Sequence, residues 1–220
     1  MTIMSARETL VETIQSLGVI AVIRMRDAGR LRSVIDALAE GGVHAIEVTM
    51  TVPNAVAMIA ELSPSLPSSF LLGAGTVTDG RTARAVIDAG ARFVVGPVFR
   101  RDVIDVCRER DVVSAPGCFS PTEILDAHDY GADIVKVFPA TALGPQYLKD
   151  IRAPLPQLRL MPTGGVTLDN AGDWIRAGAI AVGVGSALLD AAAIDSGRLD
   201  VITANARRIV ASVASARPKH

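Results

Sequence analysis

Residues 18–50 read GVIAVIRMRDAGRLRSVIDALAEGGVHAIEVTM, with an apolar run at each end and an amphipathic stretch between them. The runs 18–24 and 45–50 are rich in β-branched residues and apolar on both faces, which is typical of strands in a buried parallel sheet. Between them, apolar residues recur at helical spacing over 30–40, and Gly41 follows as a helix-ending residue. The segment therefore predicts one strand–helix–strand unit.

The same unit recurs along the rest of the chain, because apolar β-branched runs return every ~20–26 residues. The predicted strands are 18–24, 45–50, 70–77, 93–99, 112–118, 134–140, 159–166 and 181–188. Eight near-equal strand–helix units predict an α/β protein with a (β/α)8 TIM barrel and an additional N-terminal helix over 1–17. A doubly wound open sheet is the alternative, but no GxGxxG motif follows the first strand.

The composition predicts a single domain that contains the whole chain, 1–220. This length is enough for one substantial core, no Pro- or Ser-rich linker divides it, and 214–220 reads as a frayed tail. Because 50% of the residues are hydrophobic and only 4% are aromatic, the core must consist mainly of aliphatic side chains.

Charge and cysteine content exclude several classes of partner. A net charge of −1 provides no long-range attraction to nucleic acid or anionic lipid. The N-terminus lacks the apolar core of a signal peptide, and no apolar run approaches the roughly 18 residues of a membrane span. The two cysteines form no CxxC pair, and the three histidines have no neighbours at metal-ligand spacing. We therefore expect a soluble cytoplasmic protein without a metal or other cofactor.

Lys136 lies inside the apolar run 134–140, which reads IVKVFPA. It is one of only three lysines in a chain with nineteen arginines, so a general preference for lysine does not explain it. A desolvated amine can lose its proton and attack a carbonyl to form a Schiff base, whereas a guanidinium stays charged. The structural alternative is a lysine that pairs with a carboxylate or extends to the rim.

Glu47 is the candidate partner of Lys136. Alternation along the second predicted strand puts Ala45, Glu47 and Thr49 on one face. If that face points into the barrel, Glu47 is a buried carboxylate that needs a partner, and Lys136 is the lysine able to meet it. A buried Lys–Glu pair adds little stability by itself. Because both residues lie near the carboxyl ends of their strands, where barrel active sites form, a catalytic pair is favoured over a structural one.

Glycine-rich strand ends predict a phosphate site. Gly164 and Gly165 lie at the end of the seventh predicted strand, and Gly185 and Ser186 at the end of the eighth, which is the usual position for phosphate in such barrels. Arg24 directly ends the first strand and can hold a carboxylate or phosphate, with a salt bridge at the rim as the alternative. The other substrate-binding candidates at strand ends are Thr76, Pro97, Phe138 and Thr163.

Several segments occur in an order that is similar to a known family. They are GVIAVIR (18–24), EVTMTVP (47–53), GAGTV (73–77), PG (116–117) with PTE (121–123), VKVFP (135–139), PTGGV (162–166) and VGVGS (182–186). Together they closely resemble the 2-keto-3-deoxy-6-phosphogluconate (KDPG) aldolase family, which includes 4-hydroxy-2-oxoglutarate (KHG) aldolases and 6-phosphogalactonate relatives.

The resemblance implies a class I, metal-independent aldolase of the Entner–Doudoroff pathway, usually a homotrimer. Such an enzyme cleaves KDPG, a keto-sugar-acid phosphate, to pyruvate and glyceraldehyde 3-phosphate. Lys136 matches the Schiff-base lysine of the family, Glu47 its general acid/base, and Thr76 a residue that contacts the pyruvate carboxylate. Gly164, Gly165 and Ser186 match its phosphate site.

The chain departs from the common family pattern at Thr51. Many members have an arginine there that holds the substrate carboxylate, and Arg24 can take over this role here. The alternatives are a KHG or 6-phosphogalactonate aldolase, a phosphate-binding epimerase or isomerase without a covalent intermediate, and a non-catalytic sugar-acid-phosphate sensor. A trapped covalent adduct would separate the aldolases from the other two classes.

Overall fold

The computed structural model describes residues 5–25 and 28–217, and its strands are all parallel to their neighbours. The strands are β1 (Val19–Ile23), β2 (Ala45–Thr49), β3 (Leu71–Gly75), β4 (Phe93–Val95), β5 (Val113–Ala115), β6 (Gly117–Cys118), β7 (Val135–Val137), β8 (Leu160–Pro162) and β9 (Val182–Val184). A six-stranded sheet has the order β5-β4-β3-β2-β1-β9, and a three-stranded sheet has the order β6-β7-β8.

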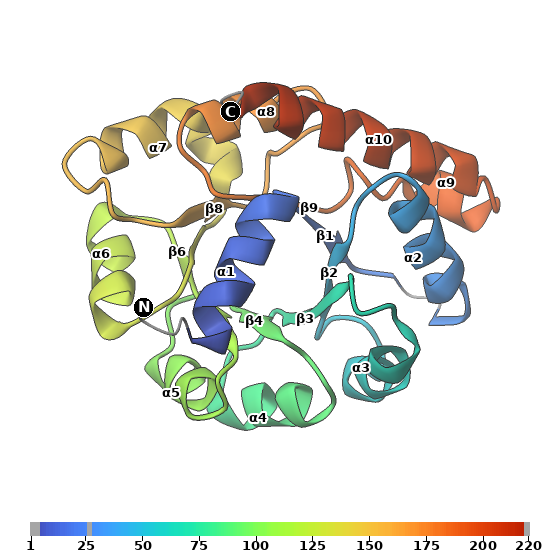
Figure 1. The fold of residues 1–220 in the computed structure, drawn as a ribbon, viewed down its shortest axis with the longest axis horizontal. Helices are drawn as coiled ribbons and strands as arrows, with labels where there is room; N and C mark the ends of the chain where they lie inside the picture. Colours follow the sequence, from blue (N-terminus) through green and yellow to red (C-terminus); the bar gives the residue numbers. More distant parts are fainter. Residues whose placement is uncertain (1–4, 26–27, 218–220) are drawn as a thin grey trace.

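Most of the helices surround the strands on the outside, and the N-terminal helix lies across one end of them (Figure 1). The helices are α1 (Ala6–Leu17), α2 (Leu31–Glu40), α3 (Ala55–Leu62), α4 (Gly80–Asp88), α5 (Arg101–Glu109), α6 (Pro121–Tyr130), α7 (Gly144–Arg152), α8 (Ala171–Arg176), α9 (Ala191–Asp195) and α10 (Leu199–Ala216). Short 3-10 turns lie at Ala28–Arg30, Ser63–Ser65 and Ala140–Ala142. Among the described residues, no helix combines the length and apolarity that a membrane span requires.

Backbone hydrogen bonds connect the two sheets into one curled parallel sheet. At one seam, the N–H groups of Ile134 and Lys136 donate to the carbonyls of Ser114 and Pro116 at 3.1 and 2.9 Å. At the other seam, a parallel bridge joins Thr163 to Gly183. The expected α/β fold with a parallel sheet is therefore confirmed.

Each predicted strand region contains an observed strand, and 112–118 contains two. The interruption falls at Pro116, which has no N–H to donate to the strand ladder.

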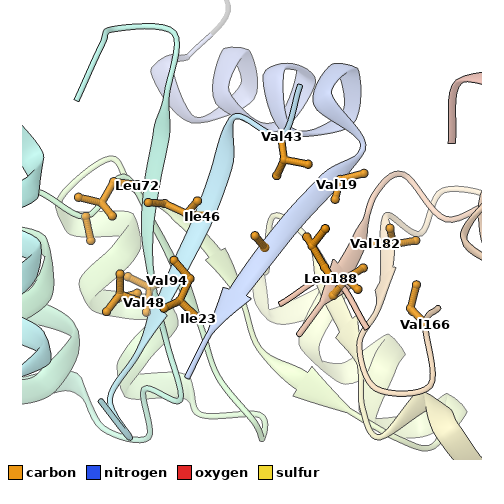
Figure 2. Packing of buried hydrophobic residues seen from close by; sticks show 14 of the residues in the cluster. Val19, Ile23, Val43, Ile46, Val48, Leu72, Val94, Val166, Val182 and Leu188 are labelled. Carbon is orange, nitrogen blue, oxygen red and sulfur yellow. The ribbon is translucent and has the colours of Figure 1, made fainter. Parts of the chain in front are cut away.

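Strand residues alternate between two apolar cores. Val19, Ile46, Leu72 and Val182 belong to the outer core, between the sheet and the surrounding helices (Figure 2). The inner core instead contains inward-facing residues, most of them near the strand starts, together with three side chains of α1. Its members are Leu10, Val11, Ile14, Ile20, Ala45, Leu71, Phe93, Val95, Val113, Ala115, Ile134, Met161 and Ala181. Helix α1 therefore packs against the amino-terminal end of the curled sheet and leaves the carboxyl end for other contacts.

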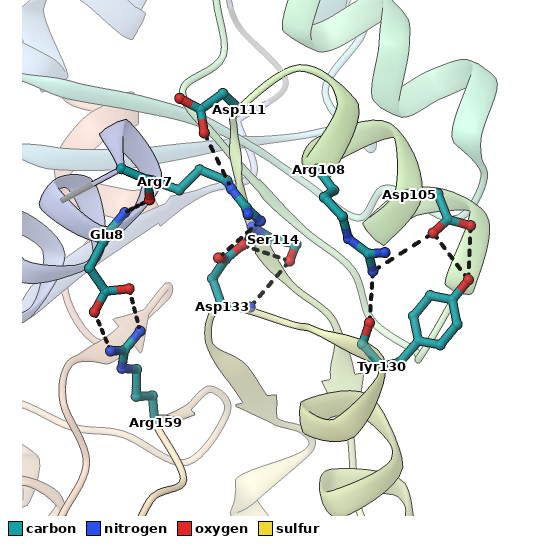
Figure 3. Close-up of polar contacts among 10 residues, drawn as sticks. Arg7, Glu8, Asp105, Arg108, Asp111, Ser114, Tyr130, Asp133 and Arg159 are labelled. Atoms are coloured by element: carbon teal, nitrogen blue, oxygen red, sulfur yellow. Dashed lines mark hydrogen bonds and ion pairs between the residues drawn. The ribbon is translucent and has the colours of Figure 1, made fainter. Parts of the chain in front are cut away.

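Ion pairs attach α1 to this amino-terminal end (Figure 3). Arg7 of α1 pairs with Asp133 at 3.3 Å, just before β7, and with Asp111 at 3.4 Å. The next residue, Glu8, accepts two hydrogen bonds from Arg159, just before β8. The predicted N-terminal helix thus exists from Ala6 onward, with Ser5 as its N-cap, and residues 1–4 lie outside the described residues.

The sequence predicted a frayed tail over 214–220, and the start of this range was placed too early. Helix α10 continues to Ala216, because its Val213 is buried and Arg217 donates to the backbone carbonyls of Gln15 and Ser16 at the end of α1. The final residues, 218–220, lie outside the described part of the chain.

Candidate active site

Lys136 and Glu47 both point into the interior of the curled sheet. Val135 and Val137 pack in the outer core, so alternation turns Lys136 of β7 inward. Ile46 and Val48 place Glu47 of β2 inward in the same way. Lys136 is 2% exposed and Glu47 is 1% exposed. The inward face that alternation predicted for the second strand is therefore the observed one.

Burial pushes the two groups toward their neutral forms. Desolvation is the largest influence on each: it raises the pKa of Glu47 and lowers the pKa of Lys136. Their opposite charges act in the other direction, and the nearby charge of Arg24 lowers both pKa values. A neutral amine is a nucleophile, and a carboxyl group with a raised pKa is a stronger base that can accept a proton and return it.

The Glu47 carboxyl group has no fixed partner. Neither of its oxygens makes a hydrogen bond to any other described residue. Buried polar groups are nearly always hydrogen-bonded, so an unpaired carboxyl group in the interior calls for a functional explanation. Its oxygens are free to bind a hydroxyl group or a water molecule.

An aromatic ring lies next to the lysine. The Nζ atom of Lys136 is 4.8 Å from the centroid of the Phe138 ring, a distance at which the ring face attracts a cation. The backbone N–H of Phe138 donates to the carbonyl of Cys118 at 2.9 Å, and this hydrogen bond fixes the position of the backbone that carries the ring. The predicted site residue Phe138 therefore contacts the predicted nucleophile.

A cavity of ≈ 110 Å³ gathers most of the remaining candidates. Its lining includes Arg24, Phe138, Thr163, Gly164, Gly165, Gly185 and Ser186, together with Val22, Val166, Gly183 and Ala187. Gly164 and Gly165 have φ values of 85° and 76°, which glycine adopts without steric cost. The Thr163 hydroxyl is buried there without a hydrogen-bond partner among the described residues. The structure thus brings together residues that are more than 160 positions apart in the sequence.

A second cavity of ≈ 480 Å³ lies next to the first and shares Val22, Arg24, Gly185 and Ser186 with it. Its other lining residues are mainly apolar: Met25, Leu189, Ala191, Ile194 and Asp195. Arg24 is exposed and stands between the two spaces. Its position at the end of β1 therefore permits contact with an anion in either of them.

Thr76 and Pro97 follow β3 and β4 but are not among the residues that line these two cavities. Thr76 has φ = 59°, an uncommon conformation for a β-branched residue. Both residues are partly buried, so each keeps some accessible surface at the carboxyl ends of the strands. Their contact with substrate stays a prediction.

One residue of the site escaped the sequence reasoning. A Cβ atom on Gly75, at the end of β3, would lie 1.7 Å from Oε1 of Glu47. The GAGTV segment marked this region, but the sequence contains no signal that relates Gly75 to a glutamate on the preceding strand. Within the described part of the chain, no cluster of three His, Cys, Asp or Glu side chains could hold a metal ion.

Comparison with known proteins identifies the family. Residues 10–205 match the aldolase family described as KDPG and KHG aldolase. A 2-dehydro-3-deoxy-phosphogluconate aldolase of Pseudomonas aeruginosa is 36% identical over 191 residues, which cover 86% of this chain and 85% of that protein. A 2-dehydro-3-deoxy-6-phosphogalactonate aldolase of Escherichia coli is 32% identical over 173 residues, covering 78% and 84%.

The fold agrees with solved structures of the same family. A crystal structure of KDPG aldolase from Legionella pneumophila, with pyruvate captured at low pH as a covalent carbinolamine intermediate, matches with a TM-score of 0.84. It is 29% identical, and the match covers 90% of this chain and 97% of that one. These matches confirm the resemblance drawn from the motifs, and the chain belongs to the KDPG and KHG aldolase family of lyases.

Proposed function

We propose that this protein is a class I aldolase that reversibly cleaves KDPG to pyruvate and glyceraldehyde 3-phosphate through a Schiff base on Lys136. The observation that carries the proposal is a lysine that is 2% exposed and has a pKa lowered by burial, in the same interior as Glu47. Only the unprotonated amine can attack the keto carbon of the substrate.

The reaction requires proton transfers at several atoms, and Glu47 is the residue that makes them. Attack of the Lys136 amine on C2 of the keto acid gives a carbinolamine, which loses water to form a protonated imine. Abstraction of the C4 hydroxyl proton then breaks the C3–C4 bond: C4 leaves as the aldehyde of glyceraldehyde 3-phosphate, and the electrons of the broken bond enter the imine to form an enamine. Proton return to C3 and addition of water release pyruvate and the free amine.

The cavity beside Arg24 and Ser186 holds the far end of the substrate. Phosphate binds to the backbone N–H groups of Gly164 and Gly165 and to the Ser186 hydroxyl, while Arg24 holds a phosphate or carboxylate oxygen in its guanidinium fork. Thr76 contacts the pyruvate carboxylate, and Pro97 contacts the substrate beside it. Binding energy at the phosphate positions the bond that breaks near the lysine.

Features of the whole molecule follow from the same proposal. The curled sheet closes as a (β/α)8 barrel within a single domain, which the hydrogen bonds at both seams support. Membership in the aldolase family supports a cytoplasmic homotrimer that acts in the Entner–Doudoroff pathway. Light scattering coupled to gel filtration tests the trimer, since a mass of one or two 23.0 kDa chains would contradict it.

Borohydride trapping tests the central claim. The protein is mixed with excess pyruvate and sodium borohydride, and the reduced adduct is located by peptide mass spectrometry. We expect a pyruvyl adduct on the peptide that contains Lys136, and none in the matched variant Lys136→Arg, which keeps a long basic side chain that cannot form an imine. A folded wild-type protein that gives no adduct would contradict the aldolase and would favour an acid–base isomerase or a sensor.

Substrate choice is tested separately. The relatives include 6-phosphogalactonate aldolases, so KDPG, its galactonate epimer and 4-hydroxy-2-oxoglutarate are compared by kcat/KM. We expect the highest value for KDPG. A higher value for either alternative would keep the mechanism and reassign the substrate.

A further inference from the structure

The side chain of Glu47 occupies the space directly above Gly75. A Cβ atom built on Gly75 would lie 1.7 Å from Oε1, 2.4 Å from Cδ and 2.6 Å from Cγ of Glu47. Non-bonded carbon atoms approach to about 3.5–4.0 Å. Three successive atoms of one side chain therefore fill the place that any residue other than glycine would need.

Backbone conformation does not explain this glycine. The φ angle of Gly75 is not positive, and the residue lies inside the regular ladder between β2 and β3, opposite Thr49. Its carbonyl accepts a hydrogen bond from the N–H of Met50 at 2.8 Å. Because the ladder holds both backbones, an added methyl group cannot be accommodated by a strand shift, and the Glu47 side chain must move instead.

Packing is what places the carboxyl group of Glu47. Neither oxygen has a hydrogen-bond partner among the described residues, so no directional contact holds the side chain in its orientation. Gly73, two residues earlier on the same inward face, pairs in register with Glu47, but a Cβ there would meet the Phe93 ring at 2.3 Å. The space above Gly75 is thus the one into which the carboxyl group extends.

We infer that Gly75 is a positioning residue for the reaction: its missing side chain provides the space in which the Glu47 carboxyl group is held for proton transfer at the substrate bound to Lys136. This inference rests on the proposed aldolase function and adds a residue to it. The substitution Gly75→Ala displaces the carboxyl group while Lys136 keeps its own contacts.

Proton exchange at C3 of pyruvate measures this role directly. The enamine gains and loses a proton at C3, so deuterium from D2O enters the methyl group of pyruvate at a rate that nuclear magnetic resonance can follow. We expect Gly75→Ala to slow this exchange by on the order of a hundredfold or more, the loss typical for removal of a general acid–base group. Borohydride trapping after long incubation should still yield the Lys136 adduct.

The matched control is Gly73→Ala. The overlap is similar in size, but it falls on Phe93, a core side chain with 1% exposure, and not on Glu47. We expect this variant to unfold at a lower urea concentration and yet to exchange pyruvate protons within about threefold of the wild-type rate while folded. An equal loss of exchange in both variants would overturn the inference.

A double variant separates positioning from a general structural effect. In a Glu47→Ala background the added methyl group has no carboxyl group to displace, so Gly75→Ala should leave the residual exchange rate unchanged. A further large loss there, or wild-type exchange in Gly75→Ala alone, would overturn the inference. If Gly75→Ala does not fold, the inference requires that the double variant Glu47→Ala/Gly75→Ala folds, because the overlap with the carboxyl group is then gone. A double variant that does not fold would refute the inference. A wild-type protein that neither exchanges nor traps pyruvate would instead refute the aldolase function, and the role of Gly75 with it.

Discussion

Removal of the contact between Asp133 and Ser114 should measurably lower the stability of the protein. This contact lies at the end of the molecule opposite the proposed site. The Asp133 carboxylate accepts hydrogen bonds from the N–H and the hydroxyl of Ser114, both at 2.9 Å, and pairs with Arg7 at 3.3 Å (Figure 3). Ser114 is 1% exposed, so water cannot replace a lost acceptor without rearrangement. This cluster joins β5, the start of β7 and helix α1.

The magnitude follows from the groups that Asp133→Ala leaves behind. Loss of the acceptor for a buried N–H costs about 1–3 kcal/mol. Loss of the partly buried pair with Arg7, whose side chain is 24% exposed, adds about 0–1 kcal/mol. We expect the free energy of unfolding to fall by about 2–3 kcal/mol. Asp133→Asn keeps an oxygen that can accept the Ser114 N–H, so its cost should be about 1 kcal/mol.

Urea unfolding followed by the fluorescence of Trp174, the single and buried tryptophan, measures these differences. Asp111→Asn is the matched control, because it removes the charge of the other carboxylate of Arg7, which is 55% exposed, and Asn tolerates the positive φ of 54° at this position; it should change stability by less than about 0.5 kcal/mol. The reasoning would be refuted if Asp133→Ala cost less than about 1 kcal/mol, or if Asp133→Asn cost as much as Asp133→Ala.

Two further predictions concern the site, and a third concerns the buried thiol of Cys118. Ser186→Ala should raise KM for phosphorylated substrates by about tenfold while pyruvate trapping is unchanged, and equal losses would contradict a phosphate site. Because burial lowers the pKa of Lys136, the rate of adduct formation should rise with pH and level off below the ordinary lysine value of 10.5. Glu47→Gln removes a negative charge that raises the pKa of Lys136, so in this variant the rate should level off at a lower pH than in the wild type. Burial raises the pKa of the Cys118 thiol to about 12, so iodoacetamide at pH 8 should leave it unmodified in the folded protein, and rapid labelling there would contradict its burial.

The repeating pattern of the sequence predicted the fold because the signals are local. Apolar β-branched runs and helix-ending glycines depend on neighbours a few residues away, and each predicted strand region contains a strand. Where tertiary contacts decide, the prediction failed: helix α10 extends beyond residue 214 because Arg217 contacts the end of α1, some 200 positions earlier. The break at Pro116 is local in cause, but the strand pattern alone did not reveal it.

The candidate site shows the same division. The rarity of lysine marked Lys136, and strand alternation marked the inward face that carries Glu47, because both signals are properties of short segments. The motifs also placed Gly164, Gly165 and Ser186 at strand ends. The sequence contained no signal for the fit between Glu47 and Gly75, since these residues come from different strands and meet only when the ladder forms.

The sequence by itself determined the strand–helix order, the family and the chemical groups available at the carboxyl ends of the strands. Only the tertiary structure decided the state of those groups. The pKa of Lys136 falls and that of Glu47 rises because the interior of the curled sheet removes water from both, and desolvation depends on every strand that surrounds them. The cavity between Arg24 and Ser186 likewise exists because β1 and β9 lie side by side, a pairing between the first and the last strand of the described chain.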